Sequence, residues 1–355
     1  MLEEFEAEPK KRSKNVLVGS IAALVLLGLI GGGTLLAYDQ ISTFISRFQV
    51  EDYQGDGGPS TTIVIAPGDD GATVARKLVE ADVIKSFDAI YRGMLRADFT
   101  IYPGTYEFPT QIPGATALKI LIEGKNRVVV QVTIPEGKRI QQIREILVSE
   151  LGLKEADIDA ALESQMSRVS EKAPTLEGYL FPATYTFDPG VSAEAVITAM
   201  VNRMEAELQS YDRELKDSHD LLSIAALIQA EGKIREDFFR ISRVFANRLE
   251  AGMPLQSDPT VKYRYEGEQS NFTDGVRDRS NPFNTYIYGG VPVGPVGNPG
   301  SLAIEAALRP ADGDWLYFVS INLKTGETVF SETLSEHERA AELYRAWLRA
   351  NPGWN

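Results

Sequence analysis

The sequence predicts an α+β protein with a single N-terminal transmembrane helix, a small α+β module and a helix-rich α+β domain. Three observations support this fold class: a charge-free apolar run near the N-terminus, two strand–turn–helix patterns, and helical periodicity after residue 150. The chain has 355 residues, 43% of them hydrophobic, which is enough for two or three units that each bury a core.

The N-terminal segment predicts a membrane anchor over residues 16–38. Val16–Ala37 carries no charge, and at about 1.5 Å per residue a helix of this length spans the roughly 30 Å hydrocarbon layer. A basic cluster within residues 10–14 precedes it, so residues 1–15 are expected to form a cytoplasmic tail and the rest to lie outside the cytoplasm. A cleaved signal peptide is the alternative, with Gly31–Gly33 as the cleavage site, but the apolar run is long for one.

Residues 39–60 are predicted to be a linker, because Glu51–Ser60 is acidic, glycine-rich and contains proline. The folded part is expected to begin near Thr61, with a strand, a Pro-Gly turn and an amphipathic helix. The same order returns at VVVQVTIPEG and KRIQQIREILVSEL, with apolar residues at equal offsets from Gly68 and Gly137. This similarity indicates either a weak internal repeat or two independent copies of a common motif.

Between these segments lie Tyr102, Tyr106 and Phe108, which either stack on sugar rings or close a small core. After residue 150 the periodicity is helical, and the chain ends with a predicted hairpin over DWLYFVSI and ETVFSET. A last helix follows, in which Ser335 and Glu338 fit a capping box.

Composition excludes several classes of function. The net charge of -14 argues against nucleic-acid binding, and the lack of cysteine excludes disulfides, thiol nucleophiles and cysteine zinc sites. The only two histidines, His219 and His337, lie at the starts of helices and are not expected to act as ligands, and no glycine pattern of the phosphate-loop type follows a strand. Among the usual classes of catalysis, acid–base chemistry by a carboxyl group remains.

Glu231 is the carboxylate that the pattern singles out. Leu221–Ile228 is apolar nearly all round and is predicted to be a buried helix, which leads directly into Glu231. If Gly232 ends this helix, burial and the helix dipole both raise the pKa of Glu231 towards that of a general acid. The alternative is a surface glutamate in the final turn, followed by Lys233 and Arg235.

Two polar loops are expected near this helix, Met253–Thr260 and Ser280–Gly300. Their amide, hydroxyl and aromatic groups are those that a sugar site uses, although proline and glycine also occur in ordinary long connections.

Six motifs carry a resemblance to a known family. In chain order they are EGYLFPATY (Glu177–Tyr185), SIAALIQAEG, VFANRL, MPLQSDPT, NTYIYGGVPVGPVGNPG and AALRPADGDWLYFV. They resemble the MltG/YceG-like endolytic transglycosylases, over nearly the whole segment after the membrane span. The resemblance implies a LysM-like module, which we place at 61–127, and a YceG-like catalytic domain at 128–355.

The resemblance also implies the site. Relatives often carry two glutamates in the segment matched by Ala226–Glu231, whereas this chain has Gln229 at the first position. Glu231 is then the catalytic acid and base, or this copy is inactive, because a glutamine cannot donate and recover a proton. Glu177 is expected to support the site or to orient a turn. The other residues expected in the glycan groove are Gln256, Asp258, Asn284, Thr285, Tyr286 and Asn298.

The implied function is cleavage of the MurNAc–GlcNAc bond within nascent peptidoglycan strands, which leaves 1,6-anhydroMurNAc ends and terminates glycan polymerisation. No metal or cofactor is expected. The expected partners are glycan strands, the plasma membrane and peptidoglycan synthases of the elongation or division machinery. Two alternatives remain: a hydrolase that uses Asp258 to activate water, and a non-catalytic membrane-anchored peptidoglycan-binding scaffold.

Overall fold

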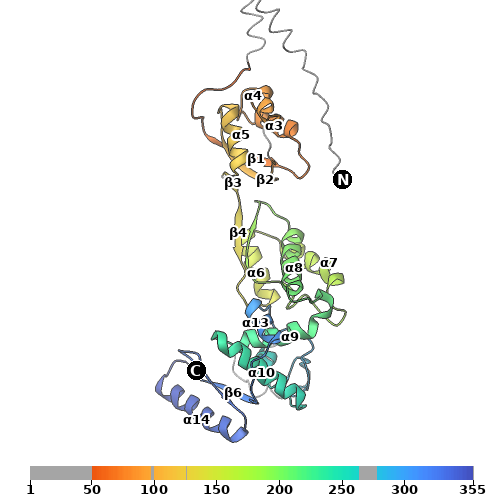
Figure 1. Cartoon of the computed structure of the whole chain (residues 1–355), viewed down its shortest axis with the longest axis vertical. Helices are drawn as coiled ribbons and strands as arrows, with labels where there is room; N and C mark the ends of the chain where they lie inside the picture. The colour runs from red at the N-terminus through yellow and green to blue at the C-terminus, as the bar shows by residue number, and fades with distance from the viewer. Residues whose placement is uncertain (1–49, 97–99, 125, 264–277, 355) are drawn as a thin grey trace, which may run out of the picture. The chain divides into compact units, whose positions relative to one another are not determined.

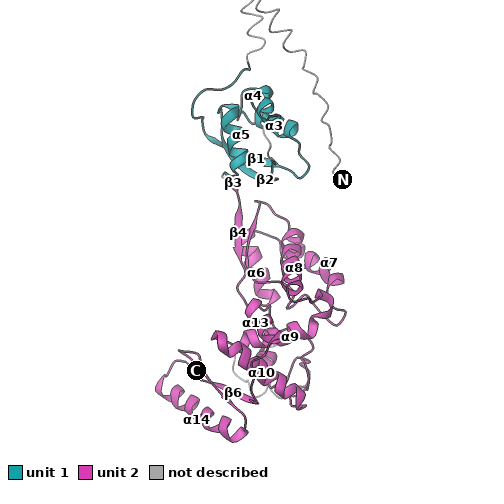
Figure 2. Ribbon diagram, in the orientation of Figure 1, with its two compact units in different colours: residues 1–127 teal, residues 128–355 magenta. Residues whose placement is uncertain are grey.

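A computed structural model describes residues 50–96, 100–124, 126–263 and 278–354 (Figure 1). The chain divides into two compact units, residues 1–127 and residues 128–355 (Figure 2). Both units combine helices with small sheets, so the α+β fold class is confirmed. The predicted transmembrane helix at 16–38 lies outside the described residues, and among the helices of the described part none is long and apolar enough to cross a membrane.

In its described residues the first unit, unit 1, has a three-stranded sheet in the order β1-β2-β3 and three helices. Strands β1 and β2 are antiparallel, with Ser60 opposite Pro109 and Ile65 opposite Gly104. In chain order the elements are β1 (Ser60–Ile65), α3 (Gly71–Glu80), α4 (Phe87–Met94), β2 (Gly104–Pro109), α5 (Gly114–Glu123) and β3 (Arg127–Val128).

The predicted strand–turn–helix order at the start of unit 1 is confirmed by β1 and α3. The carboxylate of Asp70 accepts a hydrogen bond from the Thr73 amide at 2.7 Å and so caps α3. Val74 and Leu78 face inward on this helix, and both are fully buried.

The three aromatic residues of the segment before α5 lie in different environments. Tyr106 and Phe108 lie in the core, whereas Tyr102 is 64% exposed.

Part of the segment predicted as a linker makes specific contacts with unit 1. Both carboxylate oxygens of Asp52 lie 3.0 Å from the amide of Gly114, the first residue of α5. The Tyr53 hydroxyl donates to the Asp82 carboxylate at 2.6 Å, and the Gly58 amide donates to the Thr110 carbonyl at 2.7 Å. These hydrogen bonds give residues 52–58 a defined path over the surface of unit 1.

The described part of the second unit, unit 2, contains two separate two-stranded antiparallel sheets, β4-β5 and β6-β7, among helices. The first sheet aligns Val130 with Phe187 and Thr133 with Thr184. In chain order the longer elements are β4 (Val130–Thr133), α6 (Ile140–Leu151), α7 (Glu155–Gln165), β5 (Thr184–Phe187), α8 (Ala193–Gln209), α9 (His219–Glu231), α10 (Arg235–Glu250), α11 (Asp258–Lys262), α13 (Ser301–Leu308), β6 (Tyr317–Asn322), β7 (Glu327–Ser331) and α14 (Leu334–Ala350).

Helix α9 lies in the core of unit 2. Its Leu222, Leu227 and Ile228 have no exposed surface, and the helix packs against α10, α11 and α13. The prediction of a buried apolar helix is therefore confirmed. This packing holds the C-terminal end of α9 in one place relative to the loops around it, because a buried helix cannot shift without disturbing its close-packed neighbours.

The second strand–turn–helix pattern is also confirmed, by β4 and α6. Ile143 and Leu147 are buried on α6 as Val74 and Leu78 are on α3. The equal offsets have a common cause, because each helix buries the same face against the core of its own unit.

The prediction that Ser335 and Glu338 form the capping box of α14 is wrong, because Thr333 and Glu336 form it. The helix begins after Thr333, whose hydroxyl accepts from the Glu336 amide, and the Glu336 carboxylate accepts from the Thr333 amide. Strand β7 ends at Ser331, so Thr333 is the residue with the extended backbone that an N-cap needs.

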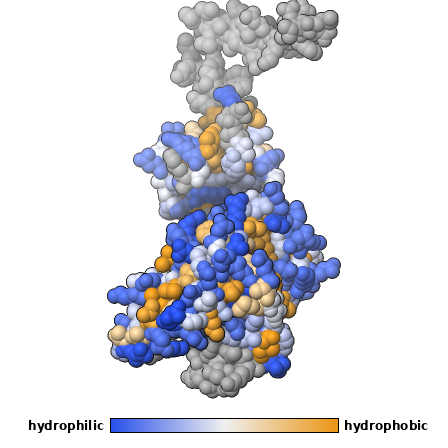
Figure 3. Space-filling model, turned by 60° about the horizontal axis from the view of Figure 1, so that its bottom comes forward, coloured by the Kyte–Doolittle hydropathy of each residue, from blue (hydrophilic) through white to orange (hydrophobic). Residues whose placement is uncertain are grey.

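Hydrophobic residues form separate patches among hydrophilic ones on the face of the molecule shown in Figure 3. Large exposed apolar side chains, such as Leu334 and Leu343 on α14, are scattered in the same way along the described chain.

Candidate active site

Glu231 is the last residue of α9, and Gly232 follows it as the C-cap, as predicted. The backbone leaves the helix there, with φ -76° and ψ 137° at Gly232. A side chain at Gly232 would collide with the ring of Phe238, since an added Cβ would lie 2.5 Å from two ring carbons. Glycine therefore allows the close turn between α9 and α10 that leaves Glu231 at the helix end.

The carboxyl of Glu231 is enclosed by protein, although part of the residue remains exposed. Burial raises its pKa to about 7, against an ordinary value of 4.5. A hydrogen bond from Ser257 and the charge of Lys262 oppose this rise, and the negative charge of Asp258 adds to it. At neutral pH a large fraction of Glu231 is therefore protonated, as a general acid requires.

Ser257 contacts Glu231 directly and belongs to the polar loop that follows α10. Its hydroxyl donates to Glu231 Oε1 at 2.8 Å. The Ser257 amide donates to Thr285 Oγ1 at 3.0 Å, and the hydroxyl oxygens of Thr260 and Thr285 lie 2.9 Å apart. The two polar loops predicted to surround the site thus meet beside Glu231, at buried hydroxyl groups.

Asp258 and Tyr286 form a pair in this region. The Tyr286 hydroxyl donates to Asp258 Oδ1 at 2.6 Å, and both side chains are partly exposed. Burial, followed by the hydrogen bond to Asp258, raises the pKa of Tyr286 above its ordinary range, so the phenol remains a donor. The charge of Glu231 also acts on Tyr286, so the structure brings these three predicted site residues together.

Gln256 precedes Ser257 and is exposed, with a left-handed backbone (φ 49°) that is unusual for a residue other than glycine. Its amide donates to the Thr285 carbonyl at 3.1 Å, and the buried Arg248 side chain donates to the Leu255 carbonyl at 2.8 Å. These contacts hold the strained backbone in place. Gln256 is therefore available to a ligand, with its main chain fixed.

Three predicted groove residues are buried instead. Asn284 and Asn298 have no exposed surface, and Thr285 has 1%. The Asn284 amide nitrogen donates to the Asp278 carbonyl at 3.2 Å, and its Oδ1 accepts from the Tyr286 amide at 3.0 Å. Buried side chains with protein partners shape the loops, and in this conformation they do not present polar groups to a glycan.

Glu177 is also buried, with 5% of its surface exposed. Its carboxylate accepts hydrogen bonds from the Ile140 amide (3.1 Å), the Tyr263 hydroxyl (3.0 Å) and the Asn298 side chain (2.8 Å). Burial raises the pKa of Glu177 to about 7 despite these donors and the charge of Arg139. These contacts are to protein groups, and the role of Glu177 in supporting the site or orienting a turn stays a prediction.

Gln229, at the position where the resemblance led us to expect a second glutamate, faces α13. Its Oε1 accepts from the amide of Gly300, the N-cap of α13, at 3.0 Å. Gln229 thus satisfies a backbone donor at a helix start.

The sequence did not predict a role for Ser257 or Tyr263. Ser257 lies within the motif MPLQSDPT, but the motif does not show which of its polar side chains faces Glu231.

Both histidines make contacts with neighbouring protein groups. His219 is buried, with its ring between the Tyr179 hydroxyl (3.1 Å) and the Val293 carbonyl (3.0 Å), and His337 stacks on Tyr317 at 5.4 Å between ring centroids. Within the described residues no group of histidine and carboxylate side chains is arranged to hold a metal ion.

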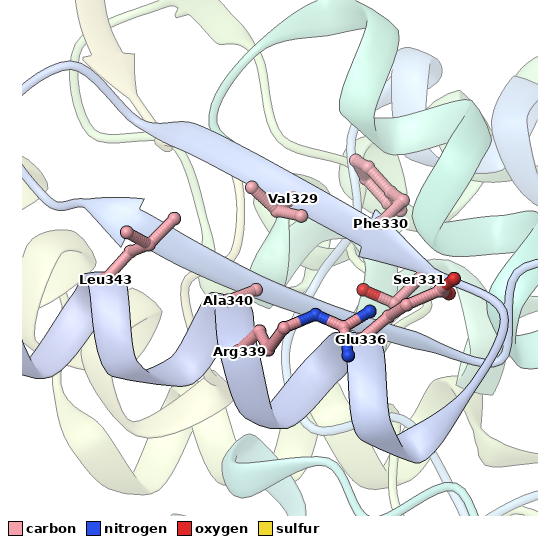
Figure 4. A pocket seen from close by; sticks show the side chains of 7 residues that line it. All are labelled: Val329, Phe330, Ser331, Glu336, Arg339, Ala340 and Leu343. Carbon is pink, nitrogen blue, oxygen red and sulfur yellow. The ribbon is translucent and has the colours of Figure 1, made fainter.

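A pocket of about 400 Å³ lies between β7 and α14 (Figure 4). It includes Glu336 and Arg339 but none of the predicted site residues. The hydrogen bonds from the Thr333 and Glu332 amides hold the pKa of Glu336 below its ordinary value, so this carboxylate is ionised at neutral pH. It is therefore not a proton donor at neutral pH.

Comparisons with known proteins agree with one another. The model of the YceG-like family matches residues 63–343. An endolytic murein transglycosylase of Bacillus subtilis (strain 168) is 32% identical over 317 residues, which cover 83% of this chain and 88% of that protein. One of Streptococcus pneumoniae (serotype 2, strain D39) is 28% identical over 364 residues, covering 90% of this chain and 64% of that protein. The crystal structure of a putative YceG-like protein from Listeria monocytogenes is 30% identical with a TM-score of 0.51, covering 80% of this chain and 99% of that one.

Proposed function

The chain belongs to the YceG-like family, and on this premise we propose that it is an endolytic murein transglycosylase, which cleaves within the glycan strands of peptidoglycan. The two relatives from Bacillus subtilis and Streptococcus pneumoniae are named for that activity, and their similarity extends over most of this chain. The observation that carries the proposal is the enclosed carboxyl of Glu231, whose pKa near 7 suits both proton donation and proton recovery at neutral pH.

In the proposed reaction, protonated Glu231 donates its proton to the glycosidic oxygen as the bond from that oxygen to C1 of N-acetylmuramic acid breaks. The C1 centre develops oxocarbenium character, and the C6 hydroxyl of the same sugar attacks it. Glu231, now ionised, accepts the C6 hydroxyl proton. The products are a free hydroxyl on the leaving sugar and a 1,6-anhydro end, and Glu231 is again protonated.

One carboxyl suffices in this scheme because the nucleophile is part of the substrate. An intramolecular hydroxyl has a high effective molarity, whereas glycosidases that use water need a second carboxylate to activate it. Ser257 stabilises the ionised form of Glu231 between the two proton transfers, since its hydroxyl donates to Oε1. Gln256, Asp258 and Tyr286 are partly or fully exposed near Glu231 and are proposed to contact the glycan.

The hydrolase remains the second candidate, because the charge of Asp258 reaches Glu231 and supplies a second carboxylate at the site. Activation of water by Asp258 would leave a reducing end, which is heavier than the anhydro end by one water molecule.

We propose that residues 16–38 anchor the protein in the plasma membrane with the catalytic unit outside the cytoplasm. Residues 61–127 are proposed to form a LysM-like module that binds peptidoglycan. Cleavage near the membrane would terminate glycan polymerisation beside the synthases of elongation or division. Digestion of intact spheroplasts by an external protease tests this topology. Protection of unit 2 from the protease would exclude it.

The activity test uses the full chain in detergent with uncrosslinked glycan strands, followed by mass spectrometry of the products. The wild type is expected to release products with anhydro ends, and Glu231→Gln to lose them by on the order of 10²-fold or more. Glu155→Gln, on the exposed start of α7, is the matched control with wild-type activity. Reducing ends in place of anhydro ends would establish the hydrolase, and full activity of Glu231→Gln would refute the role of Glu231.

A further inference from the structure

Glu177 lies at the junction of three chain segments of unit 2. Its carboxylate joins residues 137–140 through the Ile140 amide, the end of α11 through the Tyr263 hydroxyl, and the loop before α13 through the Asn298 side chain. Asn298 itself donates to the Lys138 carbonyl at 2.9 Å, and its Oδ1 accepts from the Leu180 amide at 2.9 Å. The three segments therefore form one hydrogen-bonded cluster.

Each of these segments also reaches the last turn of α9, where Glu231 lies. Tyr263 directly follows α11, whose N-cap Ser257 donates to Glu231 at 2.8 Å. Asn298 is two residues before Gly300, whose amide donates to Gln229 at 3.0 Å. At Gly137 an added Cβ would lie 3.5 Å from Gln229 Cγ, so this backbone also packs against the last turn of α9.

The connection through α11 is short and rigid. This helix spans Asp258–Lys262, so Ser257 and Tyr263 are about 9 Å apart along its axis. Arg139 holds the same end of the helix, since it donates to the Tyr263 carbonyl at 3.1 Å and its guanidinium lies 5.0 Å from the centroid of the tyrosine ring. A movement at Tyr263 is therefore transmitted to Ser257.

The carboxylate of Glu177 has no acceptor capacity directed to solvent. Its Oε1 accepts from Ile140 and Asn298, its Oε2 accepts from Ile140 and Tyr263, and only 5% of the residue is exposed. Direct contact with a glycan would require these bonds to break.

We propose that Glu177 is a positioning residue: it fastens the end of α11 and the loop before α13, so that Ser257 meets Glu231 and Gly300 meets Gln229. The effect of Glu177 on activity rests on the proposed catalytic role of Glu231. Its effect on the position of Ser257 does not, because that effect can be measured from the protonation of Glu231 in the absence of substrate.

The experiment measures the titration of Glu231 in the full chain in detergent micelles, with glutamate labelled by ¹³C at Cδ and the Glu231 signal identified from its loss in Glu231→Gln. Tyr263→Phe removes one hydroxyl and keeps the ring, so it tests the connection without the fold loss that Glu177→Gln risks. Tyr185→Phe is the control, since it also removes a hydroxyl of a partly buried tyrosine, which donates to the Phe181 carbonyl.

We expect Tyr263→Phe to raise the titration midpoint of Glu231 by about 0.5 to 1 pH unit, because a misplaced Ser257 no longer stabilises the ionised form. In the Ser257→Ala background the same substitution should cause no further shift, since the contact it acts through is already absent. Tyr185→Phe should leave the midpoint unchanged.

An unchanged midpoint in Tyr263→Phe would overturn the proposal, as would an equal shift in the presence and absence of Ser257. The activity assay then separates this failure from failure of the proposed function. If the wild type releases no anhydro products, the function is wrong, while the titration still decides whether Glu177 positions Ser257.

Discussion

The hydrogen bond from Ser257 to Glu231 makes a quantitative prediction about the pH dependence of activity. The hydroxyl stabilises the ionised carboxylate, so its removal in Ser257→Ala must raise the pKa of Glu231 above its wild-type value of about 7. A hydrogen bond to a charged group contributes about 1.5 to 3 kcal/mol, and one pKa unit corresponds to about 1.36 kcal/mol. Because Glu231 is partly exposed and water can replace part of the lost bond, we expect a rise of about one unit.

The consequence for activity has a definite sign. The first proton transfer needs protonated Glu231, so the rate falls as the pH rises through its pKa. With the pKa raised from about 7 to about 8, the protonated fraction at pH 8 increases from roughly one in eleven to one half. Ser257→Ala should therefore raise the ratio of the rate at pH 8 to the rate at pH 6 by about 5-fold relative to the wild type.

The assay is the initial rate of anhydro-end formation from uncrosslinked strands between pH 5 and pH 9. Ser257 makes no side-chain bond to cap α11, so the substitution removes the contact with Glu231 without removing a helix cap. Ser149→Ala is the control, because that hydroxyl donates to a backbone carbonyl on the exposed side of α6. The proposed effect of Ser257 on the pKa of Glu231 would be refuted if, in Ser257→Ala, the rate fell at the same pH as in the wild type or at a lower pH.

Three further predictions concern stability. Burial raises the pKa of Glu177 from 4.5 to about 7, so the folded state binds more protons between these values, and the free energy of unfolding falls by about 3 kcal/mol as pH rises through that window. Denaturant titrations at pH 5 and pH 8 should show a smaller difference in Glu177→Gln, and an equal difference would contradict the assigned shift. Gly178→Ala should lower the free energy of unfolding by about 3 kcal/mol, because φ is 84° and an added Cβ would lie 2.4 Å from Pro295, whereas Gly190→Ala, with φ 77° and open space, should cost only about 1 kcal/mol; equal losses in thermal melts would exclude the clash. Arg248→Met should cost about 3 kcal/mol in denaturant titrations, since it leaves the half-buried Leu316 carbonyl and the buried Leu255 carbonyl without these donors. Arg248→Lys should restore little because the two bonds need the guanidinium geometry; full recovery with lysine would disprove that requirement.

The course of α9 could be predicted from the sequence because its signals are local. An apolar run of this length requires a buried helix, Gly232 marks its end, and Glu231 is the carboxylate at that boundary. Burial is the largest cause of the rise in its pKa, and the apolar composition of the helix predicts that burial. The core positions on α3 and α6 were predictable for the same reason, as apolar residues at helical spacing mark the buried face.

Two features could not be predicted in this way: the capping box of α14, and which side chains of the polar loops are buried and which are exposed. Thr333 with Glu336 and Ser335 with Glu338 both fit the capping pattern, and the end of β7 selects the first pair. Asn284 and Asn298 look like sugar-binding groups in the sequence, yet both side chains are buried. Asn284 binds backbone groups of its own loop, and Asn298 binds the backbone of a distant segment. Amide side chains serve either purpose, so composition does not distinguish the two roles.

The sequence by itself determined the α+β fold class, the buried helix and the carboxyl at its end, because helical periodicity and burial are properties of consecutive residues. Only the tertiary structure decided that Ser257 contacts Glu231, that Gln229 contacts Gly300, and that Glu177 joins the segments behind them. These pairs are separated by 26 to 121 residues along the chain. Their contacts depend on how the helices pack, and no local pattern in the sequence encodes which distant hydroxyl or amide will lie within hydrogen-bonding distance.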